Sequence, residues 1–169
     1  PLEQAYVAYT NEKYGKAMNH ILDFFEISVP FCSYIFLRML QQEMPGQPAI
    51  MPVLEQFVNK IDMKRPLSFG DWLNDLFTPL LAASVKFMPQ DSLVISFAAN
   101  IYVKRRNVLL GSKTMPSIVQ IRNEYRGHST TLSEEIYHGV DDLLLPRICS
   151  MIEALKPLAS CGYDIGEGR

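Results

Sequence analysis

Residues 68–81 read Ser-Phe-Gly-Asp-Trp-Leu-Asn-Asp-Leu-Phe-Thr-Pro-Leu-Leu, which is the pattern of an amphipathic helix with a defined start. Ser68 followed three residues later by Asp71 is a typical N-cap arrangement, in which each side chain can bond the backbone N–H of the other residue. The large apolar residues behind it recur every three or four positions, which is the period of an α-helix. Trp72 shares this apolar face, and we expect it to be a buried core anchor. Pro79 lies inside the helix and should bend or split it.

The same helical period covers most of the chain, and no segment alternates between apolar and polar residues as a half-buried strand would. Besides the segment after Ser68, the pattern predicts helices over about 3–27, 30–42, 51–61, 92–110, 117–126 and 132–159. Pro30 can occupy the first turn of the second helix or kink one long helix made of the first two. Gly111 and Gly127 are typical C-terminal stops, and Thr131 with Glu134 forms a capping box for the last helix. Because the connections are short, we expect an all-α bundle of five to seven mostly antiparallel helices.

The composition is that of one folded domain. The chain has 169 residues, of which 48% are apolar, so residues 1–169 are expected to bury a core and form a single domain. Its three cysteines, at positions 32, 149 and 161, lack the close spacing of a metal site. An odd, scattered set indicates buried thiols in a reducing compartment, hence a cytoplasmic location. The sequence contains no dinucleotide fingerprint or phosphate-binding glycine loop, and no cofactor is expected.

The ends of the sequence and its most apolar stretch also lead to expectations. The chain begins Pro-Leu-Glu without a Met and ends Gly-Glu-Gly-Arg, so we expect a fragment or module of a longer protein with appended domains. The best candidate for a membrane span covers residues 17–40 but contains Asp23, Glu26 and Arg38. A span needs about 20 predominantly apolar residues, so a core helix and no membrane partner are expected.

The segment from Ile118 to His128 is the chemically distinctive part of the chain. Ile118, Ile121 and Tyr125 fall on one helix face. Arg122 lies at the edge of that face, where its charge requires an ion-pair partner or a solvent-filled cleft. His128 follows the predicted end of this helix, so we expect the Arg122 guanidinium, the Asn123 amide and the His128 imidazole at one helix-to-helix turn. An imidazole can move a proton near neutral pH and an arginine can brace a phosphate oxygen, which suits phosphodiester chemistry without a metal.

These residues resemble a known family. Arg122-Asn123 followed by four residues and His128, inside an all-α domain of this size, resembles the HEPN superfamily. Its signature is Arg, four to six residues and then His, with a polar residue often directly after the Arg. Many members of that family are metal-independent ribonucleases of toxin–antitoxin, antiviral or RNA-processing systems, and they dimerise so that two motifs face each other. Others have lost activity and serve as dimerisation or sensing modules.

The resemblance implies roles for three residues. Arg122 would stabilise the phosphate, His128 would be the acid or base, and Asn123 would orient them. RNA would be cut to 2′,3′-cyclic phosphate and 5′-hydroxyl ends by a homodimer that can have an antitoxin-like partner. One toxin branch of the family has Tyr two residues after the His, where this chain has Thr130, so regulation through that tyrosine is not implied.

Other interpretations of the same residues remain open. Arg122 can pair with a carboxylate of the bundle, Asn123 can cap the helix and His128 can be a solvated loop residue. The chain would then be a non-catalytic dimerisation or sensing module, or a purely structural bundle. His20 and His138 are expected to be surface or packing residues, and adjacent Asp141 and Asp142 to be a solvated pair.

Charge distribution predicts an RNA-binding segment next to the motif. From residue 104 to residue 128 the chain has six basic residues and one acid, Glu124, for a net charge of +5. The whole chain has a net charge of −2, so the remainder carries −7. Such a segment can guide an RNA backbone, or it can be a solvated helix end whose cations offset the helix dipole. The candidate RNA-binding residues are Lys104, Arg105, Arg106, Lys113 and Arg126.

Overall fold

The protein is described from a computed structural model. The structure describes residues 1–43, 45–46, 48–62, 65–87, 93–104, 106–126 and 132–160, of which the side chains of residues 93–94, 103–104 and 157–160 are not described. Within these ranges the fold is all-α and contains no strand, which confirms the predicted all-α class. The predicted number of five to seven helices is not confirmed, because this part of the chain holds eight α-helices. In chain order the elements are α1 (Leu2–Thr10), α2 (Tyr14–Glu43), α3 (Met51–Ile61), η1 (Asp71–Phe77), α4 (Thr78–Phe87), α5 (Leu93–Ala99), η2 (Asn100–Lys104), α6 (Arg106–Leu110), α7 (Ile118–Tyr125) and α8 (Glu134–Ser160), with η1 and η2 being π-helical turns.

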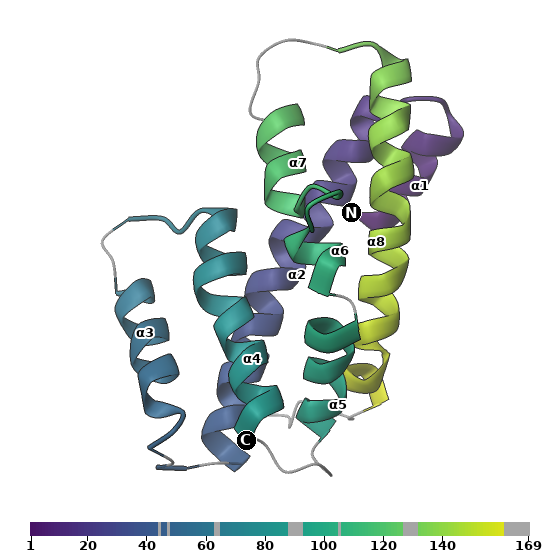
Figure 1. Cartoon of the computed structure of the whole chain (residues 1–169). Helices are drawn as coiled ribbons and strands as arrows, with labels where there is room; N and C mark the ends of the chain where they lie inside the picture. Colours follow the sequence, from purple (N-terminus) through teal and green to yellow (C-terminus); the bar gives the residue numbers. More distant parts are fainter. Residues whose placement is uncertain are drawn as a thin grey trace, which may run out of the picture.

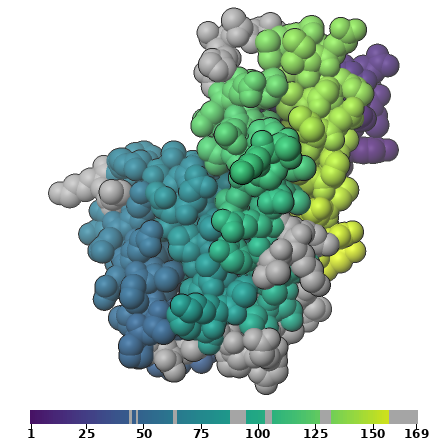
Figure 2. All heavy atoms as spheres, viewed as in Figure 1, coloured from purple at the N-terminus to yellow at the C-terminus, as the bar shows by residue number. Residues whose placement is uncertain are grey.

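The 30-residue helix α2 is the axis of the fold. It runs diagonally through the molecule, with α7 and α8 beside its first half and η1 and α4 beside its second half (Figure 1). Helix α3 is outermost and packs on η1 and α4. Figure 2 shows one face of the molecule, on which α3, α4, α7 and α8 lie next to one another and hide most of α2. The buried face of α2 holds apolar residues at helical spacing, among them Ile21, Phe25, Val29 and Phe36.

The break between the first two helices lies at a different place from the one predicted. Pro30 lies inside α2, so the alternative of one long helix through Pro30 is correct. The break comes earlier, between α1 and α2, where Glu12 has a φ of 57°. That left-handed residue turns the chain back, so that α1 packs against the first turns of α2.

The predicted start at Ser68 is confirmed. The Ser68 backbone N–H donates to Asp71 Oδ2 at 2.9 Å, and the Asp71 N–H donates to Ser68 Oγ at 3.1 Å. Asp71 also binds Lys60 of α3 at 3.1 Å, which ties α3 to η1. Hydrogen bonds from Arg65, Ser68 and Lys60, in that order of importance, hold the pKa of Asp71 below its usual range. Pro79 does mark a change of structure, because the π-helical η1 gives way to α4 at Thr78.

Trp72 differs from the prediction. Its ring is only half-buried and packs beside Tyr34 of α2 and Phe57 of α3, with ring centroids 5.4 Å and 6.3 Å apart. It therefore covers the junction of three helices at the edge of the core and is not a fully buried anchor.

Helix α2 is also the one helix among the described residues that could cross a membrane by length and composition alone. In its most apolar window 39% of the residues are buried within the fold, and the core helix of a soluble protein passes the same test. The helix is therefore weak evidence for a membrane span.

Candidate functional site

Helix α7 carries Arg122 and Asn123 of the predicted motif and is built as the sequence predicts. Ser117 caps its first turn by accepting a bond from the Gln120 N–H at 3.1 Å, while the Gln120 side chain accepts one from the Ser117 N–H at 2.7 Å. Ile118 and Ile121 are buried and hold the helix on the core. Arg122 stands at the edge of this apolar face, as expected, and its charge is directed toward α2.

Two arginines of α7 meet two carboxylates of α2. Arg122 Nε donates to Glu26 Oε1 at 3.0 Å, and Arg126 Nη2 donates to Asp23 Oδ1 at 2.7 Å. Arg126 Nη1 also lies 3.4 Å from Glu26 Oε1, which joins the two pairs into one network. Between 29% and 37% of each of these four side chains is exposed. The network is therefore open to solvent along one side, and its two positive charges are balanced by two negative ones.

Asn123 completes the predicted arrangement on the α7 side. Its Oδ1 accepts a bond from Arg122 Nη1 at 3.3 Å. Glu26 and Asn123 thus hold the Arg122 guanidinium at two of its nitrogens, and within the described residues its Nη2 has no partner. A guanidinium oriented in this way can direct its remaining N–H groups at a phosphate oxygen.

His20 is a member of this cluster that the sequence interpretation assigned to surface or packing. Its Nδ1 lies 3.8 Å from Asp23 Oδ2, whereas Arg126 binds the other carboxylate oxygen, Oδ1. The available signal was the spacing of three between His20, Asp23 and Glu26, with apolar residues at 21–22 and 24–25 between them. Such spacing lines residues along one side of a helix.

The structure gathers some of the predicted site residues and not others. Arg122, Asn123 and Arg126 lie together, whereas His128 falls outside the described residues, as does Arg105. Arg106 lies over the Tyr102 ring at 5.5 Å, and Lys113 is exposed in the turn before α7. Lys104 ends η2, and its side chain is not described. Within the described residues no hydrogen bond or ion pair joins Arg106 or Lys113 to Arg122, and these RNA-binding assignments stay predictions.

A second polar cluster lies where α1 meets α8. Tyr9 Oη donates to Asp142 Oδ1 at 3.4 Å, and His138 Nδ1 lies 3.4 Å from Asp142 Oδ2. The Tyr14 ring meets His138 edge-on, with centroids 4.4 Å apart. The side chains of His138 and Asp142 are 41% and 56% exposed, and we interpret the cluster as a packing contact that holds α1 against α8.

The prediction of a solvated Asp141–Asp142 pair is wrong for Asp141. Its residue is fully buried, and neither carboxylate oxygen has a hydrogen-bond partner within the described residues. Burial, and to a smaller degree the charges of Asp142 and Glu134, raises the pKa of Asp141 to about 7. The error came from the adjacent positions, because neighbours on a helix point about 100° apart and one of the two faces the core.

The described residues contain no candidate metal cluster, and their two cysteines differ in burial. Among the described residues no group of three or more His, Cys, Asp or Glu side chains could hold a metal ion. Cys32 is buried, as predicted, and burial raises the pKa of its thiol to about 12. Cys149 is exposed, contrary to the prediction of buried thiols, because its position on α8 faces away from the core.

Comparison with protein-family models, with curated protein sequences and with solved structures gives no significant match for this chain.

Proposed function

We propose that this domain is a metal-independent endoribonuclease of the HEPN type, acting in the cytoplasm as a toxin or defence protein. The observation that carries the proposal is the meeting of Arg122, Asn123 and Arg126 on one partly exposed surface. Glu26 holds Arg122 at its Nε, and this orientation leaves guanidinium N–H groups for a ligand. His128 follows Arg126 by only two residues in the sequence.

The chemistry follows from these groups. The ribose 2′-oxygen attacks the adjacent phosphorus, the bond from phosphorus to the 5′-oxygen breaks, and the products carry a 2′,3′-cyclic phosphate and a 5′-hydroxyl. His128 takes the 2′-proton or supplies the proton that the leaving 5′-oxygen needs, and Arg122 stabilises the charge that develops on the phosphate. In a homodimer the two roles of the imidazole can be divided between the two copies.

A second candidate function is a non-catalytic dimerisation or sensing module. It is favoured by the charge balance of the cluster, since Asp23 and Glu26 neutralise Arg126 and Arg122 as in a structural brace between two helices. In that case the network would hold α7 on α2 and would bind no ligand.

Cleavage of RNA by wild type and by the His128→Ala variant separates these functions. We expect wild type to cut a mixed RNA pool in EDTA at neutral pH, and His128→Ala to be slower by about 10²–10⁴, the usual contribution of proton transfer. Arg122→Lys should also be strongly impaired, because a point charge cannot reproduce a planar two-pronged contact. The measurement is gel electrophoresis with end-group analysis of the products.

The exposed Lys86 provides a control for the arginine variant. Lys86→Arg exchanges the same two residue types on α4, outside the cluster, and should cut RNA like wild type. Equal cleavage by wild type and His128→Ala, or no cleavage by a verified wild-type dimer, would favour the non-catalytic module.

A further inference from the structure

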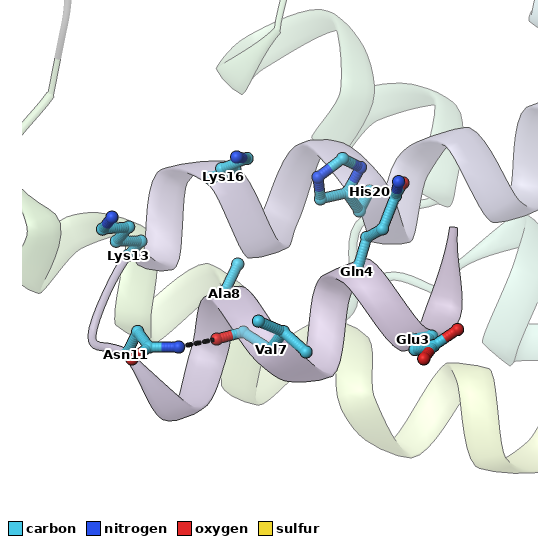
Figure 3. A pocket seen from close by; sticks show the side chains of 8 residues that line it. All are labelled: Glu3, Gln4, Val7, Ala8, Asn11, Lys13, Lys16 and His20. Atoms are coloured by element: carbon cyan, nitrogen blue, oxygen red, sulfur yellow. Dashed lines mark hydrogen bonds between the residues drawn. The ribbon is translucent and has the colours of Figure 1, made fainter.

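An open groove lies between α1 and the first two turns of α2. It has a volume of about 350 Å³. Figure 3 shows Lys13, Lys16 and His20 along its α2 side, with Gln4 of α1 beside His20. Glu3 lies at the opposite end from Lys13, and Asn11 turns its amide nitrogen to the Val7 carbonyl at 2.6 Å.

The positive charge of this groove is not neutralised by the protein. Within the described residues neither Lys13 nor Lys16 forms an ion pair, whereas both arginines of the α7 network do. Two lysines and one glutamate give the groove lining a net charge of +1 with His20 neutral. Both lysines also stand at the N-terminal end of α2, where the helix dipole is positive and cations are unfavourable. An anion placed between the two lysines would reduce their repulsion from each other and from the positive end of the helix dipole.

The groove leads directly to the predicted active site. Lys16, His20 and Asp23 follow one another on the same side of α2, and Asp23 holds Arg126 at 2.7 Å. Lys16 and Asp23 are seven residues apart, which is about 10 Å along the helix axis. That distance corresponds to about three nucleotides of a stacked strand at about 3.4 Å each.

We propose that the groove between α1 and α2 binds the phosphate backbone of a single RNA strand close to the point of cleavage. The two lysines hold successive phosphates, and the Gln4 side-chain amide offers a hydrogen-bond donor to the same strand. The identity of the strand rests on the proposed ribonuclease function, whereas the presence of an anion site rests on the groove itself. The predicted basic stretch around Arg106 is not required for this path.

The test measures binding of a 2′-O-methyl RNA strand, which keeps the phosphates but lacks the attacking hydroxyl. We expect the double variant Lys13→Gln/Lys16→Gln to bind more weakly than wild type. Each single-strand phosphate contact contributes about −0.7 to the slope of log affinity against log salt concentration, so the slope should become shallower by about 1.4. The matched control, Lys86→Gln/Lys156→Gln, removes the same charge from exposed positions on α4 and near the end of α8 and should keep the wild-type slope.

The outcomes separate this inference from the proposed function. A slope that becomes shallower by the expected amount in Lys13→Gln/Lys16→Gln, together with a wild-type protein that does not cut unmodified RNA, supports the groove and contradicts the nuclease. If Lys13→Gln/Lys16→Gln cuts and binds RNA like wild type, the groove proposal is overturned and the nuclease proposal stands. Wild-type protein that binds a polyglutamate peptide or phosphatidylserine vesicles more tightly than the RNA strand would also overturn it.

Discussion

Gly111 occupies a position that no other residue fits. Its φ is 75°, in the left-handed region, and a Cβ added there would lie 2.6 Å from the Met115 carbonyl oxygen and from the Ser117 nitrogen. The turn that presents α7 therefore depends on the absence of a side chain. This glycine was predicted as a helix stop, and the structure confirms that role, since its N–H bonds the Asn107 carbonyl at 3.0 Å.

Gly111→Ala should consequently lower the free energy of unfolding, by roughly 2–4 kcal/mol from strain and the clash with backbone atoms. The control is Gly46→Ala, because Gly46 has a similar φ of 71° but nothing within 4 Å of an added Cβ. That variant should lose only about 1 kcal/mol, the cost of the backbone conformation. Urea titrations of both variants measure the difference. Equal losses would show that the close approach to Met115 contributes nothing.

Asp141 makes the stability of the fold depend on pH. In the unfolded chain its pKa is about 3.9, and burial raises the folded pKa to about 7. Since the native state then holds the proton more tightly, the free energy of unfolding should fall as pH rises from about 4 to about 7 and change little above that. Below the unfolded pKa the carboxyl is neutral in both states and costs nothing through ionisation.

Asp141→Asn should remove this part of the pH dependence. An amide cannot ionise, so the variant should be more stable than wild type at pH 8, by roughly 1–3 kcal/mol. Asp142→Asn, at the exposed neighbouring position, should leave most of the pH dependence in place, because burial is the larger cause of the raised pKa of Asp141. The measurement is urea denaturation at several pH values between 4 and 8. Parallel curves for wild type and Asp141→Asn would contradict the assignment.

At the scale of elements, the contacts that hold α7 on the fold determine whether its arginines can be replaced without unfolding the helix. Ile118 and Ile121 are buried beneath the helix, whereas each ion pair to α2 is about one-third exposed. Apolar burial contributes more than a solvent-screened ion pair, so the isoleucines should hold α7 and the arginines should be free to serve a ligand.

Ile121→Ala should lower the free energy of unfolding by about 2–5 kcal/mol, the usual cost of such a truncation in a core. Arg122→Gln should cost less than about 1 kcal/mol, as expected for a partly exposed ion pair. Thermal unfolding of both variants under the same conditions gives the comparison. A larger loss for Arg122→Gln than for Ile121→Ala would mean that the network is the structural brace of the alternative function.

Pro30 and the break after α1 show why element boundaries are harder to predict than elements. Pro30 was one expected boundary, yet α2 continues through it because the flanking residues Phe25, Val29 and Phe36 are buried on one face. The break near Glu12 has only weak local signals. It follows from the packing of α1 against α2, which a local pattern does not contain.

At the scale of the whole molecule, one exposed face of α2 indicates how two copies would associate. Ile27, Phe31 and Tyr34 are 60%, 63% and 48% exposed, and they continue the line of His20 and Asp23 along the helix. Beside Tyr34, an apolar groove of about 320 Å³ between α2 and α3 extends this surface. We propose that a second copy covers it, as the expected homodimer requires. A two-fold axis near Ile27 would place each Asp23 about 6 Å along its helix from the axis, so the two clusters would lie close together.

Phe31→Asp should therefore shift the protein to a monomer, because it places a charge at the centre of this surface. Sedimentation at tens of micromolar should show a dimer for wild type and a monomer for the variant. Ile136→Asp, at an exposed apolar position on α8, is the control and should remain dimeric. Wild type that is strictly monomeric would contradict the interface and any active site composed of two copies, but not the fold.

The sequence by itself determined the all-α class, the bounds of α3 and α7, the cap at Ser68 and the stop at Gly111. Each of these depends on residues close together in the chain, through the helical period, capping side chains and backbone freedom. It also placed Arg122 at the edge of an apolar face. Only the tertiary structure decided that Asp23 and Glu26, about a hundred positions away, would meet Arg126 and Arg122, that Asp141 would be buried, and that Lys13 and Lys16 would line a groove. Those outcomes depend on which helix faces pack together, and packing is set by the whole core rather than by any local segment.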